Sequence, residues 1–381
     1  MVSTTAAVET QFAEQFREFI KGESHEGLRK LRKAAFAAFS LLGFPTQKDE
    51  DWKYTNIAPI VREQWTVSGG RSEELTDDVI ALLGKFSFRR NGFAALNLAF
   101  GAIKVIRIAK ETSIADPIVL SFQAEENTAI FPHVVIIAEA GSKATIVESY
   151  DSAAKCLVNA AVQIVVEDNA NLTHYRVQKD APVAFNIGTT EVTIGSGSHY
   201  DSTNINLGGG ISRHDIDVKF TAEGGEAWVD GLYMLNGSQH HDTHSIIDHT
   251  VPNCTSHQTY KGVLNDHSRG VFNGKVFVRE NAHGTDAQQS NKNLLLSNDA
   301  RVDTKPQLEI FNDDVKCSHG ATVGQLEGEE LFYLLTRGLP ETLAKNLLTY
   351  GFAEQIINKI RIESIKKDLD VAVLNRLGAE I

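Results

Sequence analysis

A thiol and an imidazole stand two residues apart in segment 313–320, which reads DDVKCSHG. Residues i and i+2 of an extended strand point to the same face, so Cys317 and His319 would lie side by side, with Ser318 turned away. Thiolate sulfur and imidazole nitrogen are ligands of zinc, copper and iron–sulfur centres. Two ligands make only half of a site. Either the remaining ligands come from elsewhere, or the pair is structural, since free cysteines are among the most buried residues.

Histidines are concentrated in segment 240–267, which holds six of the 13 in the chain. Imidazole and carboxylate side chains could build a metal-dependent hydrolase, so a stand-alone metalloenzyme is the alternative function. The spacing matches no HExxH unit, however. Structural or solvent-facing roles are the simpler interpretation. The segment contains His240, His241, Asp242, His244, Asp248, His249, Cys254, His257 and His267.

Other catalytic patterns are weak or missing, and no catalytic residue is predicted. The sequence has neither a GxxxxGK[ST] phosphate loop nor a GxSxG nucleophile motif. The triplet 208–210 (GGG) is more typical of a tight turn than of a phosphate cradle. Glu280 and Asp286, with Arg279 nearby, could serve a carbohydrate-cleaving site only if they face one groove. A solvated surface is the simpler interpretation of these three residues.

The composition narrows the function further. The formal net charge is −12 and the pI is about 5.6, which argues against nucleic acid or an anionic membrane as the main partner. Three widely separated cysteines fit a reducing compartment better than a disulfide scaffold. The first residues show no secretory or transit signal, and no run is long enough for a membrane span. A cytoplasmic location is expected.

The pattern of apolar residues divides the chain into three parts. Residues 1–85 form an N-terminal helical region, in which Phe12, Phe16 and Ile20 recur four residues apart and Gly43 ends the helical pattern. The charged and aromatic run 48–55 is expected to pack its tryptophan and tyrosine onto the next part. Residues 86–318 form a β-rich core, and residues 319–381 form a C-terminal helical domain.

A repeat within the core favours a solenoid. Residues that tolerate positive φ recur every 28 positions, whereas a β-sandwich has no reason to keep one period. Helical crossovers are missing, which argues against a doubly wound α/β fold. We therefore predict a mainly β protein with a parallel β-helix core. The six repeat positions are Gly141, Asn169, Gly197, Gly225, Asn253 and Asn281.

The helical period returns after Gly320. Leu343, Leu347, Phe352 and Ile356 continue one apolar stripe. A helical domain after a solenoid either caps the end of the solenoid or offers a surface to another protein.

Several motifs in one order resemble the SufB/SufD superfamily of the SUF iron–sulfur cluster assembly machinery. The modest length and the KCSHG sequence place the chain nearer to the SufD branch than to SufB. The motifs are EDWKYT (50–55), YKGVL (260–264), GVFNGK (270–275), TDAQQ (285–289), NLLLS (293–297), DDVKCSHG (313–320), LFYL (331–334) and RG (337–338).

The resemblance implies a right-handed parallel β-helix between helical regions, and a non-catalytic scaffold subunit. Such a subunit pairs with a SufB-like paralogue and docks a SufC-like ABC ATPase through its C-terminal helical domain. It implies no permanently bound cofactor but a transient iron or iron–sulfur cluster at the heterodimer interface. Cys317 and His319 match the positions that would share it with the partner subunit. The resemblance also allows a homodimer when the chain is alone.

Overall fold

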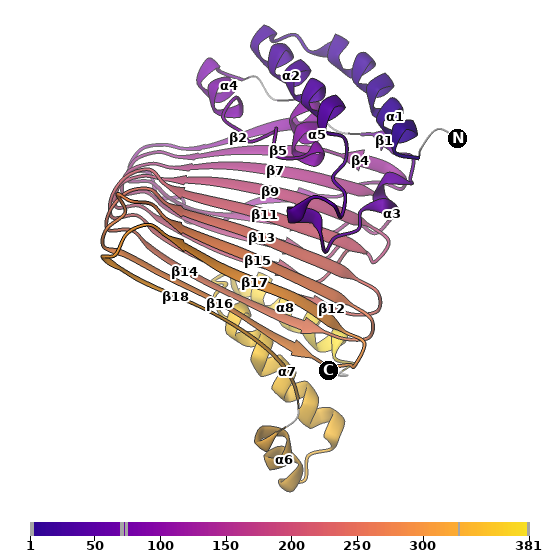
Figure 1. Cartoon of the computed structure of the whole chain (residues 1–381), viewed down its shortest axis with the longest axis vertical. Coiled ribbons are helices and arrows are strands. Elements are labelled where there is room, and N and C mark those ends of the chain that lie inside the picture. Colours follow the sequence, from indigo (N-terminus) through magenta and orange to yellow (C-terminus); the bar gives the residue numbers. More distant parts are fainter. Residues whose placement is uncertain (1–3, 69–71, 73–74, 327, 379–381) are drawn as a thin grey trace.

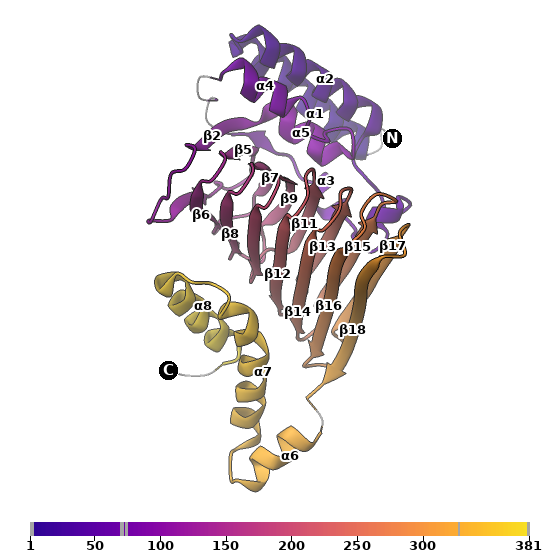
Figure 2. The ribbon, with the colours of Figure 1, turned by 90° about the vertical axis from the view of Figure 1, so that its left-hand side faces the viewer.

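The computed structural model describes residues 4–68, 72, 75–326 and 328–378. Two large sheets face each other, and from residue 143 onward successive strands alternate between them as the chain winds forward (Figures 1 and 2). All strand pairs in both sheets are parallel. The predicted parallel β-helix with flanking helices is therefore confirmed.

Within the residues that the structure describes, sheet A has ten strands and sheet B has eight. Sheet A contains β1 (Thr66–Val67), β2 (Ala102–Ile108), β4 (Thr128–Ile130), β5 (Pro132–Ala138), β7 (Leu157–Val166), β9 (Phe185–Ile194), β11 (Ile211–Phe220), β13 (His240–His249), β15 (Arg269–Val278) and β17 (Arg301–Ile310). Sheet B contains β3 (Ile118–Phe122), β6 (Lys143–Tyr150), β8 (Asn171–Gln178), β10 (His199–Asn206), β12 (Glu226–Leu235), β14 (Thr255–Leu264), β16 (Thr285–Leu295) and β18 (Val315–Gln325).

The coil length is regular at first and then drifts. Lys143 pairs with Asn171 and Asn171 with His199, an offset of 28 residues each time. Later offsets are 27 (His199 with Glu226), 29 (Glu226 with Thr255) and 31 (Thr255 with Asp286). Four repeat positions do have positive φ, but the left-handed residues near the other two are Gly224 and Gly284 instead of Gly225 and Asn281. The fixed period holds for the early coils only, because later turns change length.

Helices cover the first strands of sheet A. The N-terminal helices are α1 (Thr4–Phe19), α2 (Glu26–Leu42), α3 (Ala58–Val61), α4 (Asp77–Leu83) and α5 (Gly92–Phe100). Phe39 on α2 and Phe100 on α5 join a core that includes Val135 and Phe131 from the β5 region. Gly43 ends α2 with a φ of 63°, as expected. The run 48–55 packs as predicted, because Trp52 is buried and stacks on Phe93, with ring centroids 5.5 Å apart.

The C-terminal helices are α6 (Glu329–Thr336), α7 (Glu341–Ile357) and α8 (Glu363–Arg376). Ile356 and Ile360 pack with Val177 and Leu232 on the outer face of sheet B. The helices therefore cover the side of the β-helix, whereas its last strands stay uncovered and α6 lies away from both sheets (Figure 2). The predicted apolar stripe is buried only in part, since Leu343 and Leu347 are exposed.

Candidate functional site at the open end of the β-helix

Cys317 and His319 lie on β18, the last strand of sheet B. Cys317 pairs with Ala287 and His319 with Gln289, both of which are buried inside the preceding coil. Cys317 also packs against the interior core. The two side chains therefore share the inner face, as the spacing predicted, and Ser318 lies on the outer face.

A polar column inside the β-helix leads to His319. Gln258, Gln289 and His319 occupy matching positions on successive strands of sheet B. Gln289 donates through Nε2 to Oε1 of Gln258 at 2.7 Å. Its own Oε1 is buried and accepts no hydrogen bond from the described residues. The end of this column is therefore polar and incompletely satisfied.

Among the described strands, none pairs with the outer edge of the last coil. β17 ends the strand order of sheet A, and β18 ends that of sheet B. Large apolar side chains are exposed beside and on them, including Phe311 (55% exposed) and Val323 (49%). An edge strand presents unpaired N–H and C=O groups that can pair with another chain. We call the exposed side of β17, β18 and residue 311 the open end.

The pair offers one thiol and one imidazole, two groups that could act as metal ligands. Partial burial raises the pKa of the Cys317 thiol, and the nearby Asp286 carboxylate adds to the rise. The thiol is therefore protonated at neutral pH in the isolated chain, and a bound metal ion would have to displace its proton. No group of three or more His, Cys, Asp or Glu side chains in the described ranges could hold a metal ion. A complete site needs ligands from outside these residues.

The other two cysteines do not add ligands here. Cys156 and Cys254 are both fully buried. Cys254 donates through its thiol to the carbonyl of Pro252 at 3.3 Å, and it belongs to the interior core. Their roles in this fold are those of packed apolar side chains.

The histidine-rich segment does not form one cluster. His241 and His249 point into the β-helix, where His241 bonds Ser212 (2.8 Å) and His249 bonds Ser256 (2.8 Å). His257 stacks on Trp228 with ring centroids 4.2 Å apart, and His267 is exposed in a turn. The six histidines are dispersed because neighbouring residues of a strand point to opposite faces. The structure does not assemble the metalloenzyme site that this segment suggested.

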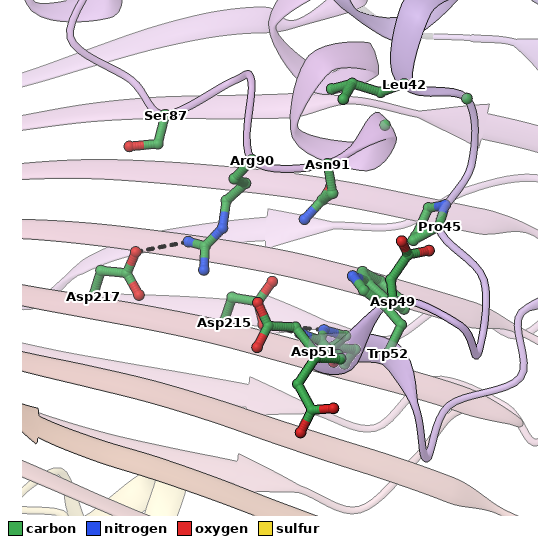
Figure 3. A pocket seen from close by; sticks show the side chains of 14 residues that line it. Leu42, Pro45, Asp49, Asp51, Trp52, Ser87, Arg90, Asn91, Asp215 and Asp217 are labelled. Atoms are coloured by element: carbon green, nitrogen blue, oxygen red, sulfur yellow. Dashed lines mark hydrogen bonds and ion pairs between the residues drawn. The ribbon is translucent and has the colours of Figure 1, made fainter. Parts of the chain in front are cut away.

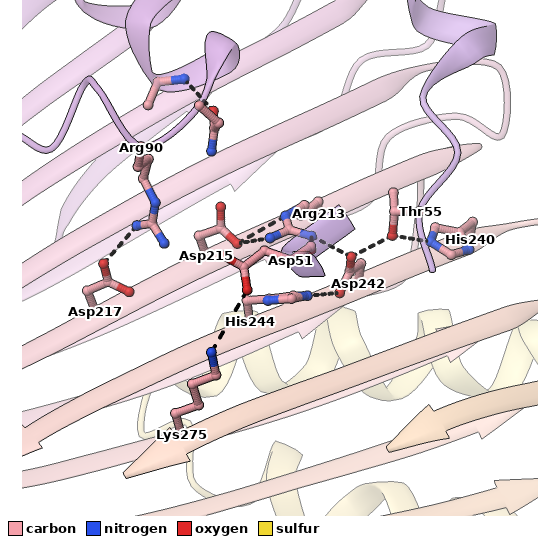
Figure 4. Close-up of polar contacts among 12 residues, drawn as sticks. Asp51, Thr55, Arg90, Arg213, Asp215, Asp217, His240, Asp242, His244 and Lys275 are labelled. Carbon is pink, nitrogen blue, oxygen red and sulfur yellow. Dashed lines mark hydrogen bonds and ion pairs between the residues drawn. The ribbon is translucent and has the colours of Figure 1, made fainter. Parts of the chain in front are cut away.

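His240 and His244 join a polar network on the outer face of sheet A (Figure 4). His244 contacts Asp242 at 3.0 Å, and Nη1 of Arg213 lies 2.7 Å from the same carboxylate. Thr55 Oγ1 lies 2.8 Å from His240 Nε2 and donates to Asp242. Burial opposes the charge of Asp242, yet Arg213 and His244 together hold its pKa below the usual range. Every charged member has a partner, so the network fixes the N-terminal segment to the sheet.

The carbohydrate-site residues are not brought together. Arg279 pairs with Asp248 at 2.7 Å. Asp286 accepts a hydrogen bond from Gln288, and no contact joins it to Glu280 among the described residues. The glycine triplet is also structural, since a Cβ on Gly208 would lie 2.2 Å from the carbonyl oxygen of Asp180.

A second surface feature was missed by sequence reasoning. A pocket of about 460 Å³ lies on the outer face of sheet A, between β11, segment 49–52 and the loop before α5 (Figure 3). We call it the outer pocket. The alternation of charges at positions 213, 215 and 217 on β11 was the available signal. The outer pocket is lined by Leu42, Gly43, Pro45, Asp49, Glu50, Asp51, Trp52, Ser87, Arg90, Asn91, Gly92, Arg213, Asp215 and Asp217.

The C-terminal helices offer a third exposed feature. On α6, Phe332 is 68% exposed and Tyr333 is 55% exposed. On α7, Leu343 and Leu347 are also exposed. This apolar surface, hereafter the helical surface, is of the kind that marks protein contacts. Within the described ranges, no helix combines the length and the apolar character that a membrane span requires.

Comparison with known proteins gives consistent matches along the chain. Residues 121–352 match the SUF system FeS cluster assembly, SufBD core domain, and residues 6–78 match the SufBD protein N-terminal region. An iron–sulfur cluster assembly SufBD family protein of Synechocystis is 35% identical over 329 residues, covering 82% of this chain and 72% of that protein. The iron–sulfur cluster assembly protein SufD of Escherichia coli is 29% identical over 384 residues, covering 89% and 90%. SufD of Bacillus subtilis is 28% identical over 274 residues, covering 71% and 62%.

Proposed function

The chain belongs to the SufBD family of iron–sulfur cluster assembly proteins, and from this premise we propose that it is a non-catalytic scaffold subunit. It pairs with a SufB-like paralogue and docks a SufC-like ABC ATPase. It contributes Cys317 and His319 to a site for iron or a nascent cluster that both subunits share. The cluster is the cargo of the complex, and we propose a cytoplasmic location.

The open end carries this proposal. It places a thiol and an imidazole on one inner face of the last coil, beside two unpaired sheet edges. A partner that extends these edges would cover the exposed apolar side chains and could supply the missing ligands in the same contact. The raised pKa of Cys317 fits this arrangement, since a metal ion would stabilise the thiolate only when the site is complete.

The helical surface is the proposed ATPase contact. Its exposed Phe332, Tyr333 and Leu343 lie on the part of the helical domain that projects from the β-helix (Figure 2). The rest of the domain is firmly attached, because Lys261 Nζ donates to the carbonyl of Phe352 at 3.0 Å. Lys359 Nζ also pairs with buried Asp230 at 2.5 Å. Motion imposed on α6 and α7 would therefore reach sheet B.

This attachment suggests how ATP could drive assembly. ATP binding would bring two ATPase subunits together, move the helical domains and shift the paired β-helices. Cys317 and His319 would then become accessible for iron and sulfur to enter and for a cluster to leave. ATP can drive the change only if it binds the two states with different affinities.

The first experiment identifies the partners. The tagged chain is recovered anaerobically from its native cells, and the co-eluting proteins are identified by mass spectrometry. We expect a SufB-like paralogue and an ABC-type ATPase. Recovery of the chain alone at native abundance would contradict the scaffold proposal.

The second experiment tests the ligands. The double change Cys317→Ser and His319→Ala should abolish iron–sulfur cluster assembly in cells while the complex still forms. The matched control is Lys316→Ala with Ser318→Ala, which alters the outer face of the same strand and should leave assembly unchanged. Assembly at the wild-type level in the first variant would show that the pair is structural.

A further inference from the structure

A short hydrogen-bonded chain of polar side chains runs inside the β-helix toward the open end. Ser245 Oγ on β13 donates to Gln258 Oε1 on β14 at 3.1 Å. Gln289 Nε2 on β16 donates to the same oxygen at 2.7 Å. All three residues are buried, and Gln289 is 3% exposed. Because Gln258 Oε1 receives both donors, the nitrogen of Gln289 is turned toward β14.

The side-chain oxygen of Gln289 is left without a donor. It is buried and accepts no hydrogen bond from any residue that the structure describes. The oxygen and the nitrogen of an amide diverge from one carbon in a plane, so a nitrogen turned toward β14 directs the oxygen away from β14. Sheet B continues on that side with β18. A buried acceptor without a donor costs free energy, so a donor from the β18 side belongs at this oxygen.

A glycine on the facing sheet makes room for the amide of Gln289. A Cβ at Gly274 on β15 would lie 2.4 Å from Gln289 Nε2, so a larger residue there would displace the amide. The nitrogen is thus held by a hydrogen bond and packed against Gly274. A side chain that is fixed on two sides in this way can orient the group next to it.

His319 occupies the next position along this column. It pairs with Gln289 in the register of β16 and β18, so the two side chains project from the same face of neighbouring strands. Adjacent strands lie about 4.8 Å apart, which is within reach of a hydrogen bond between side chains. Pro306 pairs with Gly274 and therefore lies level with His319 in the last coil. The proline side chain has no polar atom, so of these two neighbours only Gln289 can bond the imidazole.

We propose that Gln289 is a positioning residue, whose Oε1 accepts the Nδ1–H of His319 and so leaves Nε2 free as the ligand atom. The His319 side chain is exposed on the last strand, so its ring can turn toward this oxygen. Nδ1 is the ring nitrogen nearer the strand, whereas Nε2 is at the tip of the ring, where the ligands of a partner would enter. Metal-binding histidines donate their other ring N–H to a fixed acceptor, which sets the tautomer. This inference rests on the proposed function, because it takes His319 as a ligand.

The test determines the tautomer of His319 by NMR in the isolated full-length chain. Histidine is isotopically labelled, and the ring signals of His319 are identified by their loss in His319→Ala. At about pH 8, where an ordinary imidazole is neutral, we expect mainly the Nδ1–H form. Gln289→Met keeps the length of the side chain and removes the acceptor. It should lower the ratio of the Nδ1–H to the Nε2–H form at least about fivefold, the effect of one hydrogen bond.

Two further variants control this measurement. Gln288→Met is the same change on the outer face of β16 and should leave the ratio unaltered. Gln258→Met releases the nitrogen of Gln289 from one strand further away and should lower the ratio at least about twofold. It provides the test if Gln289→Met does not fold. A dominant Nε2–H form in the wild-type chain, or a ratio that neither Gln289→Met nor Gln258→Met changes, would overturn the inference.

An assay in cells connects the tautomer to the function. Gln289→Met should reduce iron–sulfur cluster assembly at least about tenfold while the paralogue still co-purifies, as expected when a metal-binding histidine loses its acceptor. Normal assembly in Gln289→Met would overturn the positioning role. The NMR result does not depend on assembly. An unaltered tautomer in Gln289→Met, together with loss of assembly in the Cys317 and His319 double variant, would therefore overturn this inference alone and leave the proposed function in place.

Discussion

The first strands of sheet A are covered by helices, whereas the last strand is exposed. At the first strands, Phe39, Phe100 and other buried side chains form a core between the N-terminal helices and the sheet. At the last strand, Phe311 and Ile310 remain exposed, and none of the helices in the described part of the chain covers β17 or β18. A solenoid needs both ends protected. The chain protects one end itself, and under the proposed function a partner covers the other, which carries Cys317 and His319.

The largest expected effect is the difference in unfolding free energy between substitutions at the covered end and at the open end. Phe39→Ala removes a ring that is 1% exposed and should lower the free energy of unfolding by about 3–5 kcal/mol. Phe311→Ala, at the 55% exposed position, should change it by less than about 0.5 kcal/mol in the isolated chain. Urea unfolding followed by circular dichroism measures both. Similar losses would mean that the open end is already covered in the isolated chain.

Binding of the partner should depend on the open end more than stability does. Phe311→Asp should weaken binding of the SufB-like paralogue by about thirtyfold, which corresponds to about 2 kcal/mol for an aromatic residue at the centre of an interface. Val119→Asp is the control, because Val119 is 57% exposed on β3 at the other end of sheet B. Surface plasmon resonance with the purified paralogue gives both affinities. An equal effect of the two changes would argue against the open end as the interface.

Acidic pH should lower the folding stability through His133 at the end that the N-terminal helices cover. Burial lowers the pKa of His133, which lies under α5, to about 4. The unfolded chain binds this proton more readily, so stability is complete above pH 6.5 and falls as the pH drops toward 4. At pH 5 the loss from this group is about 2 kcal/mol. His133→Gln should remove that part of the difference between pH 7 and pH 5 in urea unfolding, and an unchanged difference would contradict it.

The smallest effect concerns two glycines of sheet B. A Cβ on Gly262, inside the β-helix, would lie 2.2 Å from the ring of Tyr233, whereas a Cβ on Gly320 has no neighbour within 4 Å. Gly320→Ala should therefore change the stability of the isolated chain by less than about 0.5 kcal/mol, and Gly262→Ala should destabilise it clearly. Thermal unfolding compares them. A substantial loss in Gly320→Ala would show that the last coil is more crowded than its exposure indicates.

Local patterns in the sequence were sufficient to predict the fold and half of the candidate site. Residues that favour positive φ, such as Asn169 and Gly197, indicate turns independently of the rest of the chain. Cys317 and His319 share a face as soon as their segment forms a strand, because they are two residues apart. The contacts that defeated sequence reasoning are long-range. His240 and His241 are adjacent in sequence but face opposite sides of a sheet. The outer pocket joins residues near 50, 90 and 215, and no local pattern predicts that meeting.

The stacking of coils also has a consequence for synthesis on the ribosome. The strands of each coil pair with the strands of the coil before it. During synthesis, each new coil can therefore pair with strands that have already folded. The N-terminal helices and the first strands leave the ribosome before the later coils, and later coils can fold onto them. The exposed edges of β17 and β18 emerge after all the earlier coils and just before the C-terminal helices that pack on sheet B. Among the strands of the β-helix, the unpaired edges are therefore exposed for the shortest time during synthesis.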